Sequence, residues 1–384
     1  TIQLKGYAGL NISTGYRLLS AFSHFRYNNH YYVYLHPTFI IDKNQTKYHY
    51  EGNFQPLYNE ESFSGLGFEN DWVVLQIGKG NESWGAGTVQ LALSERSSLY
   101  DYLLIGSDYG KVRVRYIHGF LETVSKDNNR FITARGFEWT NQKSLIIGFS
   151  ETVIYSGENR MMDIGYFNPI SSHLEIELNN RLNEIGSMGS NGVWQIHFDY
   201  LFANSVRFSL NYLFDEFVLD KNIEIGKEHG KAHSARLAYT PFHSSNHLIT
   251  GYISFVHIGT PTFRHFYGTN NFVHKSKPLG WHKGSDSQEI AFGINYFNYK
   301  DLIIKTSVGV LKSGEQTIND NVLEPIEMQD YIKGEFPSGQ VTKTYFIESE
   351  FIYSWGKNYS ISTILQHLNK SNNFYIKLNI PIIK

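Results

Sequence analysis

The chain has 384 residues, 41% of them hydrophobic, which is enough for two ordinary domains or one large barrel and excludes a disordered polymer. Its 34 basic and 36 acidic side chains nearly cancel, so there is no overall positive field to hold a nucleic acid, and we expect no nucleic-acid partner. The absence of cysteine excludes disulfides, thiolate metal sites and cysteine nucleophiles.

The first residues, 1–5, already read as mature protein, so we expect any signal peptide to have been removed. No stretch of the sequence approaches the run of about eighteen consecutive apolar residues that a membrane-spanning helix requires. A helical membrane protein is therefore excluded. A barrel is still allowed, because its strands carry apolar residues at only every second position.

Apolar and polar side chains alternate in several segments along the chain. These segments are residues 111–116, 193–202, 206–215, 289–296 and 374–382. In 193–202, for example, the even-numbered residues are apolar, whereas Gln195, His197 and Asp199 take the other face of a strand. Strands of soluble sandwiches usually have about 5 to 6 residues, whereas about ten are needed to cross a bilayer at a tilt. The pattern favours a transmembrane barrel, with a soluble all-β fold as the alternative.

Short and long connections between these segments take turns. The short ones are 107–110, 141–143, 203–205, 242–246 and 299–301, and the long ones are 122–130, 156–191, 218–231, 258–286 and 312–342. Outer-membrane barrels have this asymmetry, with tight periplasmic turns and longer extracellular loops. We count about eighteen candidate strands, within about two either way, in a single domain over 1–384 with both termini in the periplasm. Residues 57–69 do not fit, because they form a long stretch on the periplasmic side, and an uncounted strand would explain them.

A glycine-rich segment surrounds Trp84. Residues 78–87 contain four glycines, which suits a loop folded into the barrel interior, where its backbone approaches other groups closely. The segment lacks the Walker spacing and the terminal Lys-Ser/Thr of a phosphate loop. Such a loop would either form a packing constriction inside the barrel or contact a ligand.

Residues 150–169 crowd charged groups, amides and aromatic rings together, with Glu151, Arg160 and Asn168 among them. Sugars are bound by this mixture, because rings cover the apolar faces of pyranoses while carboxylates, amides and guanidinium groups hydrogen-bond the hydroxyls. The alternative is an aromatic girdle at the membrane interface with lumenal ion pairs that satisfy one another.

A third candidate segment is 273–282, inside a long external loop. Its turn formers and its cations, which flank His274, could meet an acidic polymer. His274 and His282 are eight residues apart in a loop and do not form a metal signature. We predict no metal and no other cofactor.

The best catalytic candidates are His197, Asp199, Ser209 and Asp215, which share the polar face of one predicted hairpin. Together they could form a Ser-His-Asp grouping. Such residues are ordinary in a polar barrel interior, however, and no nucleophile elbow of the G-x-S-x-G type occurs. We therefore predict that the protein is not an enzyme.

An ordered series of short motifs runs through roughly residues 70 to 300. The motifs are Trp84-Gly85-Ala86-Gly87, Leu93-Ser94, His118-Gly119, Phe137-Glu138-Trp139, Gly148-Phe149-Ser150-Glu151, Tyr166-Phe167-Asn168-Pro169 and Lys277-Pro278-Leu279-Gly280. In sequence and order they resemble the capsule assembly Wzi family. The resemblance implies an outer-membrane barrel of about eighteen strands, and the best-studied members are surface lectins that hold capsular polysaccharide. Those members carry a periplasmic helical bundle near the N-terminus, whereas this sequence is strand-like from Ile2.

We therefore predict an all-β fold: a transmembrane up-and-down antiparallel β-barrel of about 18 strands, with long extracellular loops and short periplasmic turns, in the outer membrane of a Gram-negative bacterium. The leading hypothesis is a non-enzymatic protein that binds or anchors surface or capsular polysaccharide. The residues predicted to contact it are Trp84, Glu151, Arg160, Asn168, Asp215 and His274. The alternatives are a porin for small solutes or oligosaccharides, since so wide a barrel is open unless loops plug it, and a surface subunit of a larger envelope complex. The other expected partner is outer-membrane lipid.

Overall fold

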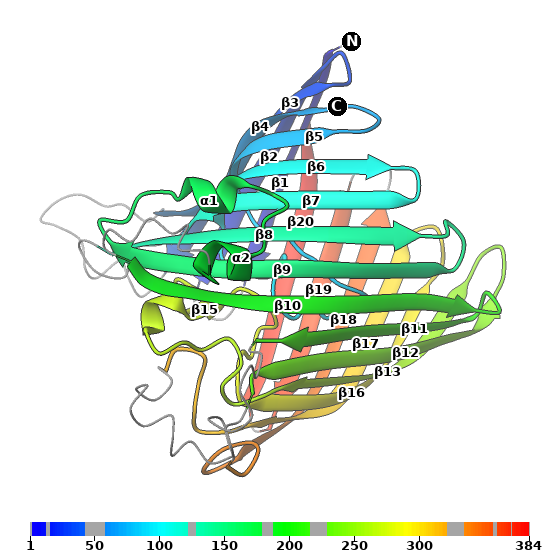
Figure 1. The fold of residues 1–384 in the computed structure, drawn as a ribbon. Helices are drawn as coiled ribbons and strands as arrows, with labels where there is room; N and C mark the ends of the chain where they lie inside the picture. Colours follow the sequence, from blue (N-terminus) through cyan, green and yellow to red (C-terminus); the bar gives the residue numbers. More distant parts are fainter. Residues whose placement is uncertain are drawn as a thin grey trace, which may run out of the picture.

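The fold is described from a computed structural model of the chain (Figure 1). The structure describes residues 2–12, 16–42, 58–121, 128–178, 187–215, 229–320, 334–355, 359–369 and 371–383. Within these residues, eighteen strands form one antiparallel sheet and two short strands form a second. Among the helices described, none combines the length and the apolar character needed to cross a membrane.

The elements, in chain order, are mostly long strands. The large sheet consists of β1 (Ile2–Ile12), β2 (Tyr16–Tyr27), β3 (Tyr31–Asp42), β4 (Tyr58–Glu69), β5 (Val74–Gly80), β6 (Tyr100–Tyr109), β7 (Val112–Phe120), β8 (Asn128–Thr140), β9 (Leu145–Glu158), β10 (Ser187–Phe202), β11 (Val206–Phe214), β12 (Lys231–His243), β13 (Leu248–Ile258), β16 (Ser287–Phe297), β17 (Leu302–Ser313), β18 (Thr342–Trp355), β19 (Tyr359–Leu368) and β20 (Ser371–Ile383). The remaining elements are α1 (Ile164–Phe167), α2 (His173–Leu178), η2 (Gly268–Asn270), β14 (Val273–His274) and β15 (Lys277–Pro278).

The large sheet is an up-and-down barrel. Successive strands pair antiparallel, with β13 followed directly by β16. The first strand, β1, pairs with β2 on one edge and with the last strand, β20, on the other. Every strand of the sheet therefore has two neighbours. The predicted fold class and the strand count of about eighteen are confirmed.

Connections on one side of the barrel are short. Residues 28–30, 70–73, 110–111, 141–144, 203–205, 244–247 and 298–301 join neighbouring strands there. Two of these turns are closed by an asparagine: the side-chain oxygen of Asn141 accepts hydrogen bonds from three following backbone N–H groups, and Asn298 does the same. An asparagine in this position replaces the backbone partner that a tight turn lacks. The predicted periplasmic turns are therefore present.

The opposite side carries the long connections, among them 81–99, 159–186, 259–286 and 314–341. The exception noted in the sequence is corrected by the structure. Most of 57–69 is not a connection but strand β4, so the count had missed one strand. On the loop side, β19 and β20 are joined by only residues 369–370.

Burial is reversed relative to a soluble protein. On β10, Ile196 is 47% exposed, whereas its neighbour His197 is 1% exposed. Exposed apolar side chains recur around the barrel, for example Leu66 on β4, Phe292 on β16 and Ile347 on β18. This is the arrangement of a barrel whose apolar face meets lipid and whose polar face meets the interior. The alternation predicted for 193–202 is confirmed.

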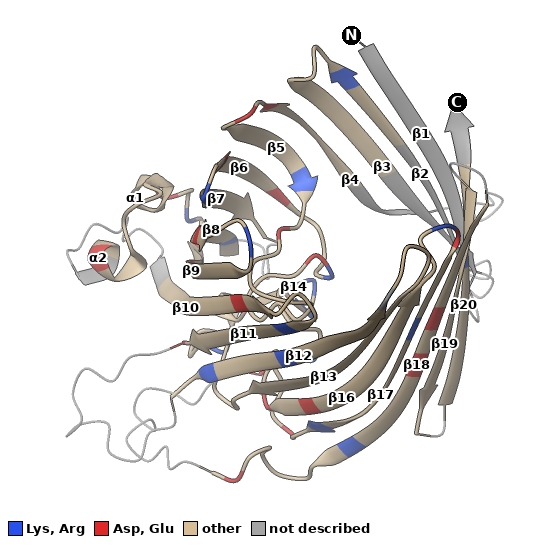
Figure 2. Ribbon diagram, turned by 90° about the vertical axis from the view of Figure 1, so that its right-hand side faces the viewer, with Lys and Arg blue, Asp and Glu red and all other residues tan. Residues whose placement is uncertain are grey.

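Loops from the long-connection side fill part of the interior. Leu91, Leu93, Phe272 and Trp281 come from two of these loops and are buried with wall residues such as Leu213 in one apolar cluster. Figure 2 shows β14 and the surrounding loops inside the ring of strands, whereas α1 and α2 lie on the other side of β8–β10. The interior and the outer face of one wall are therefore both covered by connecting segments.

Candidate functional site

The first plug loop, residues 81–99, follows β5, enters the interior and is held there by β11. Asn211 of β11 forms three hydrogen bonds with the backbone of this loop. Its side-chain oxygen accepts from Ala86 N at 2.7 Å. Its side-chain nitrogen donates to Ala86 O at 2.8 Å and to Val89 O at 3.1 Å. The same nitrogen lies 2.9 Å from the hydroxyl of Ser234. Asn211 is only 1% exposed, so these bonds form away from water and resist exchange.

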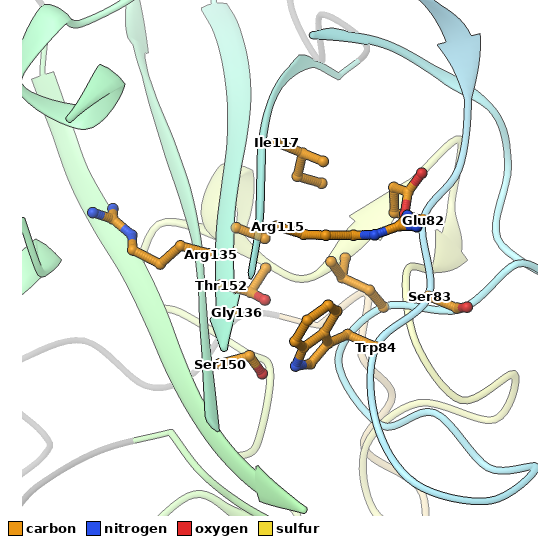
Figure 3. Close-up of a pocket in the computed structure, with 11 residues that line it drawn as sticks. Glu82, Ser83, Trp84, Arg115, Ile117, Arg135, Gly136, Ser150 and Thr152 are labelled. Atoms are coloured by element: carbon orange, nitrogen blue, oxygen red, sulfur yellow. The ribbon is translucent and has the colours of Figure 1, made fainter. Parts of the chain in front are cut away.

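The start of this loop is fixed by charge. Glu82 forms a 2.9 Å ion pair with Arg115, and Tyr102 donates a weak 3.4 Å hydrogen bond to the same carboxylate. Burial raises the pKa of the Glu82 carboxyl above its usual value, although the charge of Arg115 acts in the opposite direction. Figure 3 shows Arg115 reaching from β7 toward Glu82.

Trp84 sits against the inner face of β8. Its ring lies over Gly136, where an added Cβ would come within 2.4 Å of the indole. The guanidinium of Arg113 is 4.5 Å from the ring centre, and Trp84 is 8% exposed. The cavity beside it has a volume of about 20 Å³. That is room for about one water molecule and too little for a sugar ring.

Replacing Gly136 with Ala is expected to disturb the packing of the Trp84 ring against β8. A methyl group cannot fit at 2.4 Å, so the Trp84 ring must shift, at an expected cost of about 1 to 3 kcal/mol in unfolding free energy. Gly251 on β13 is the matched control, because nothing lies within 4 Å of its added Cβ. The two variants are compared by thermal unfolding in detergent. Equal melting temperatures would contradict the close packing of Trp84 against Gly136.

The predicted catalytic grouping does not form a triad. The Nε2 atom of His197 is 2.8 Å from Glu138, whose carboxylate also pairs with Arg113. The hydroxyl of Ser209 instead donates to Asp199 at 2.8 Å. Ser209 therefore faces a carboxylate rather than an imidazole, which is not the arrangement of a nucleophile and its base.

Asp215, the fourth residue of that grouping, ties two loop-side segments together. It lies directly after β11, where its carboxylate accepts a hydrogen bond from the backbone N–H of Phe263. Its own N–H donates to Gly230 O at 2.9 Å. Asp215 therefore anchors the second plug loop, residues 259–286.

The second plug loop is bound both to the wall and to the first. Arg130 of β8 is fully buried and donates to the backbone oxygens of Thr269, Asn271 and Val273. His274 lies 2.9 Å from Leu99 O through its Nε2 atom. The two plug loops also approach backbone to backbone, and an added Cβ on Gly280 would collide with Leu91 O. Only glycine allows this approach.

An aromatic set of three neighbouring rings, His265, Phe266 and Tyr267, lies on the second plug loop, where the first two rings are half-buried. The Tyr267 ring contacts both of the others: its centre is 4.7 Å from that of Phe266 in an edge-to-face arrangement and 6.0 Å from that of His265. Tyr267 is 42% exposed. The following turn, η2, contacts the loop-side ends of β9 and β10, where the Ser156 and Thr269 hydroxyls are 2.9 Å apart. Rings presented on a fixed support are suited to stacking against a sugar face.

The remaining three predicted binding residues lie away from the plug loops, in another part of the structure. Glu151, Arg160 and Asn168 lie in or beneath the flap, which we define as residues 159–178 with α1 and α2. The carboxylate of Glu151 is 2.9 Å from the His173 ring and 3.0 Å from Arg135. Arg160 is 1% exposed and donates to Ser156 O and Gly189 O.

Asn168 is exposed, and its side chain closes a turn with Ile170 N and Ser171. The six predicted residues are thus divided between the plug loops and the flap rather than brought to one site. Sequence reasoning missed Asn211, Arg130 and the aromatic set at 265–267. The run of three rings inside a long loop was a usable signal for the last, whereas an isolated asparagine or arginine on a strand carried none.

Among the residues that the structure describes, no three His, Asp or Glu side chains are grouped so that they could hold a metal ion.

No protein-family model and no curated protein matches this sequence. Among solved structures, the chain is similar to Wzi of Escherichia coli, an outer-membrane protein involved in group 1 capsule assembly and described as a carbohydrate-binding β-barrel. The two are 12% identical with a TM-score of 0.68, over 99% of this chain and 85% of that chain.

The chain is also similar to two Pseudomonas proteins. With a BenF-like porin from Pseudomonas fluorescens Pf-5, the TM-score is 0.53 at 8% identity, over 99% and 97% of the two chains. With OprD of Pseudomonas aeruginosa, it is 0.51 at 10% identity, over 100% and 96%. At such identities the likeness shows the fold alone. In fold, this chain is an outer-membrane β-barrel similar to Wzi, as the sequence resemblance implied.

Proposed function

We propose that this is a non-enzymatic outer-membrane protein of a Gram-negative bacterium that binds surface polysaccharide on the loop side of its barrel. The observation that carries the proposal is the aromatic set at 265–267, with Tyr267 exposed, on a second plug loop that is hydrogen-bonded to the wall and to the first plug loop. A rigid platform lowers the entropy cost of binding a flexible polymer. The likeness in fold to a carbohydrate-binding barrel supports the same proposal.

In this proposal the residues predicted from the sequence take different roles. Trp84, Asp215 and His274 hold the plug loops in place. Glu151, Arg160 and Asn168 hold the flap in place and do not themselves contact the glycan. The polar groups that would accompany the rings are the exposed Lys275 and Lys277 of the same loop, which suit an acidic polymer.

Replacing Tyr267 with Ala is expected to weaken glycan binding at least about tenfold, equivalent to about 1.4 kcal/mol, because a stacking face is removed while the plug remains. The measurement is a glycan array followed by titration of the detergent-solubilised protein with the best ligand. Tyr109→Ala is the control, since Tyr109 is 73% exposed but lies beside a short turn on the opposite side of the barrel. Equal loss in both variants, or no binding to any glycan, would count against the proposal.

A porin is the second candidate, and a specific observation favours it. The lumenal faces of β17 and β18 carry hydrated charges: Lys305 and Glu350 form a 2.8 Å pair with side chains 51% and 26% exposed, and Glu348 is also exposed. Exposed charged groups on an inner wall belong to a water-filled region. The plug loops therefore leave part of the interior to water.

Conductance in planar bilayers distinguishes the two candidates. We expect the intact protein to show little or no steady current, because the plug loops are anchored to the wall by buried hydrogen bonds. A large, steady conductance in the wild-type protein would support the porin and contradict a closed lumen.

A further inference from the structure

Alternation along the strands places the flap on the outside of the barrel. The pairing of β7 to β10 aligns Tyr116, Arg135, Glu151 and Trp194 in one row. This row lies two residues toward the loop side from Phe137, Phe149 and Ile196, which are exposed on the outer face. Since side chains two apart share a face, the row is also on the outer face. Figure 3 agrees, because Arg135 points away from Trp84 and the interior.

The flap covers this row. Tyr116 donates a 2.8 Å hydrogen bond to Tyr166 O, and Arg135 donates a 3.0 Å bond to Asn168 O. The His173 ring of α2 packs against Trp194 in a tilted arrangement, with ring centres 4.4 Å apart. Beneath the helices, Phe131, Val153, Tyr155, Tyr166 and Ile176 form a separate buried apolar cluster.

The charges in this row are unusual for an outer face. Arg135 and Glu151 have side chains only 11% and 2% exposed. A charged pair that faced acyl chains without cover would be costly. The flap removes both groups from the membrane environment and supplies hydrogen-bond partners from its own backbone and from His173.

The exposed surface of the flap ahead of α2 is mainly apolar. Ile164 and Ile170 are 84% and 89% exposed, and Met161 is 74% exposed. Between residues 159 and 172 no exposed residue is charged, since Arg160 and Asp163 are both buried. Exposed apolar clusters of this kind mark a contact with a partner or a membrane.

This surface continues the lipid-facing belt of the wall. Glu151 lies two residues beyond Phe149 on β9, which is a rise of about 7 Å at about 3.3 Å per residue. The flap therefore begins where the exposed apolar belt of β8 to β10 ends. Continuity with the belt is the reason to choose lipid over a protein partner.

We propose that the outward surface of the flap, with Met161, Ile164 and Ile170, inserts into the lipid at the outer edge of the membrane and there shields the Arg135–Glu151 pair. The flap acts as an interfacial segment of the kind that lies in the membrane plane with its apolar side buried. Its attachment to β9 couples the loop side of the barrel to the membrane surface. The inference concerns the barrel wall and does not depend on glycan binding.

The test uses the natural absence of cysteine in the chain. Single variants Ile170→Cys, Leu66→Cys and Asn319→Cys are labelled with an environment-sensitive fluorophore in the full-length protein. They are then reconstituted at low density into phosphatidylcholine vesicles with or without nitroxide-labelled lipid. Leu66 is the lipid control, because it is exposed on β4, and Asn319 is the water control, because it is exposed in the 314–320 loop segment.

The label at position 170 is expected to show the blue-shifted emission of the label at 66 and a comparable loss of fluorescence to nitroxide lipid. The label at 319 should show neither effect. Emission and quenching at 170 equal to those at 319 would overturn the proposal. Energy transfer between labelled copies, without quenching by nitroxide lipid, would also overturn the proposal, because it would show that this surface is a contact between two chains. Ile164→Cys repeats the measurement if the variant at 170 does not insert correctly.

Discussion

Replacing Asn211 with Asp is expected to release the first plug loop and open the barrel. The change removes the side-chain donor that bonds Ala86 O, Val89 O and the Ser234 hydroxyl, and it places a charge at a site that is 1% exposed. Unsatisfied buried groups cost about 1 to 3 kcal/mol each, so we expect the held state to lose about 3 kcal/mol or more. That is about a hundredfold shift toward the detached loop. Planar-bilayer conductance should rise, and protease should cut within 81–99.

The control for this change is Asn295→Asp, the same substitution on the lumenal face of β16 and away from the plug loop. It should leave conductance and protease resistance as in the wild type. Heat-modifiable mobility on gels checks that both barrels are folded. If the first plug loop of Asn211→Asp stays resistant to protease while the barrel remains folded, the hydrogen bonds of Asn211 are not what closes the lumen.

Replacing Glu151 with Gln is expected to detach the flap. The glutamine keeps the shape but leaves the Arg135 guanidinium, with a side chain 11% exposed, without its counter-charge. Removing one partner of a buried ion pair costs about 3 to 5 kcal/mol. His173 loses the same carboxylate, from which its ring nitrogen is 2.9 Å away. Limited proteolysis should cut between 159 and 178 in the variant and not in the wild type.

Glu350→Gln is the matched control, because its pair with Lys305 is hydrated and should contribute less than about 1 kcal/mol. Adding Arg135→Gln to Glu151→Gln should recover part of the loss, since the unpaired charge is then removed as well. Equal destabilisation by Glu151→Gln and Glu350→Gln would show that the flap does not depend on the ion pair.

Much of the barrel could be predicted from the sequence. Gln195, His197 and Asp199 were assigned to the face opposite Ile196, and burial agrees with that assignment. The short turns were located from the spacing of the alternating segments, and the structure shows that local hydrogen bonds close them, as at Asn141. The one missed strand, β4, contains Ser62, Ser64, Gly65 and Gly67, which weaken the apolar alternation that identified the others.

The candidate site was less predictable. Glu151 could have been assigned to the outer face, because it follows Ile147 and Phe149 at intervals of two. Its partners could not, since Arg135 comes from a neighbouring strand and His173 from a helix that folds back over the wall. Trp84 was correctly placed in a loop that enters the barrel, but the glycine that receives it, Gly136, lies on β8.

The sequence by itself determined most of the strands, the two faces of the wall and the side on which the long loops lie. It could do so because alternation and turn chemistry depend only on residues adjacent in the chain. Only the tertiary structure decided that 81–99 folds into the interior while 159–178 folds over the outside. Loops have no periodicity, and their paths depend on distant partners such as Asn211 and Arg135, which chain folding alone brings within hydrogen-bond distance.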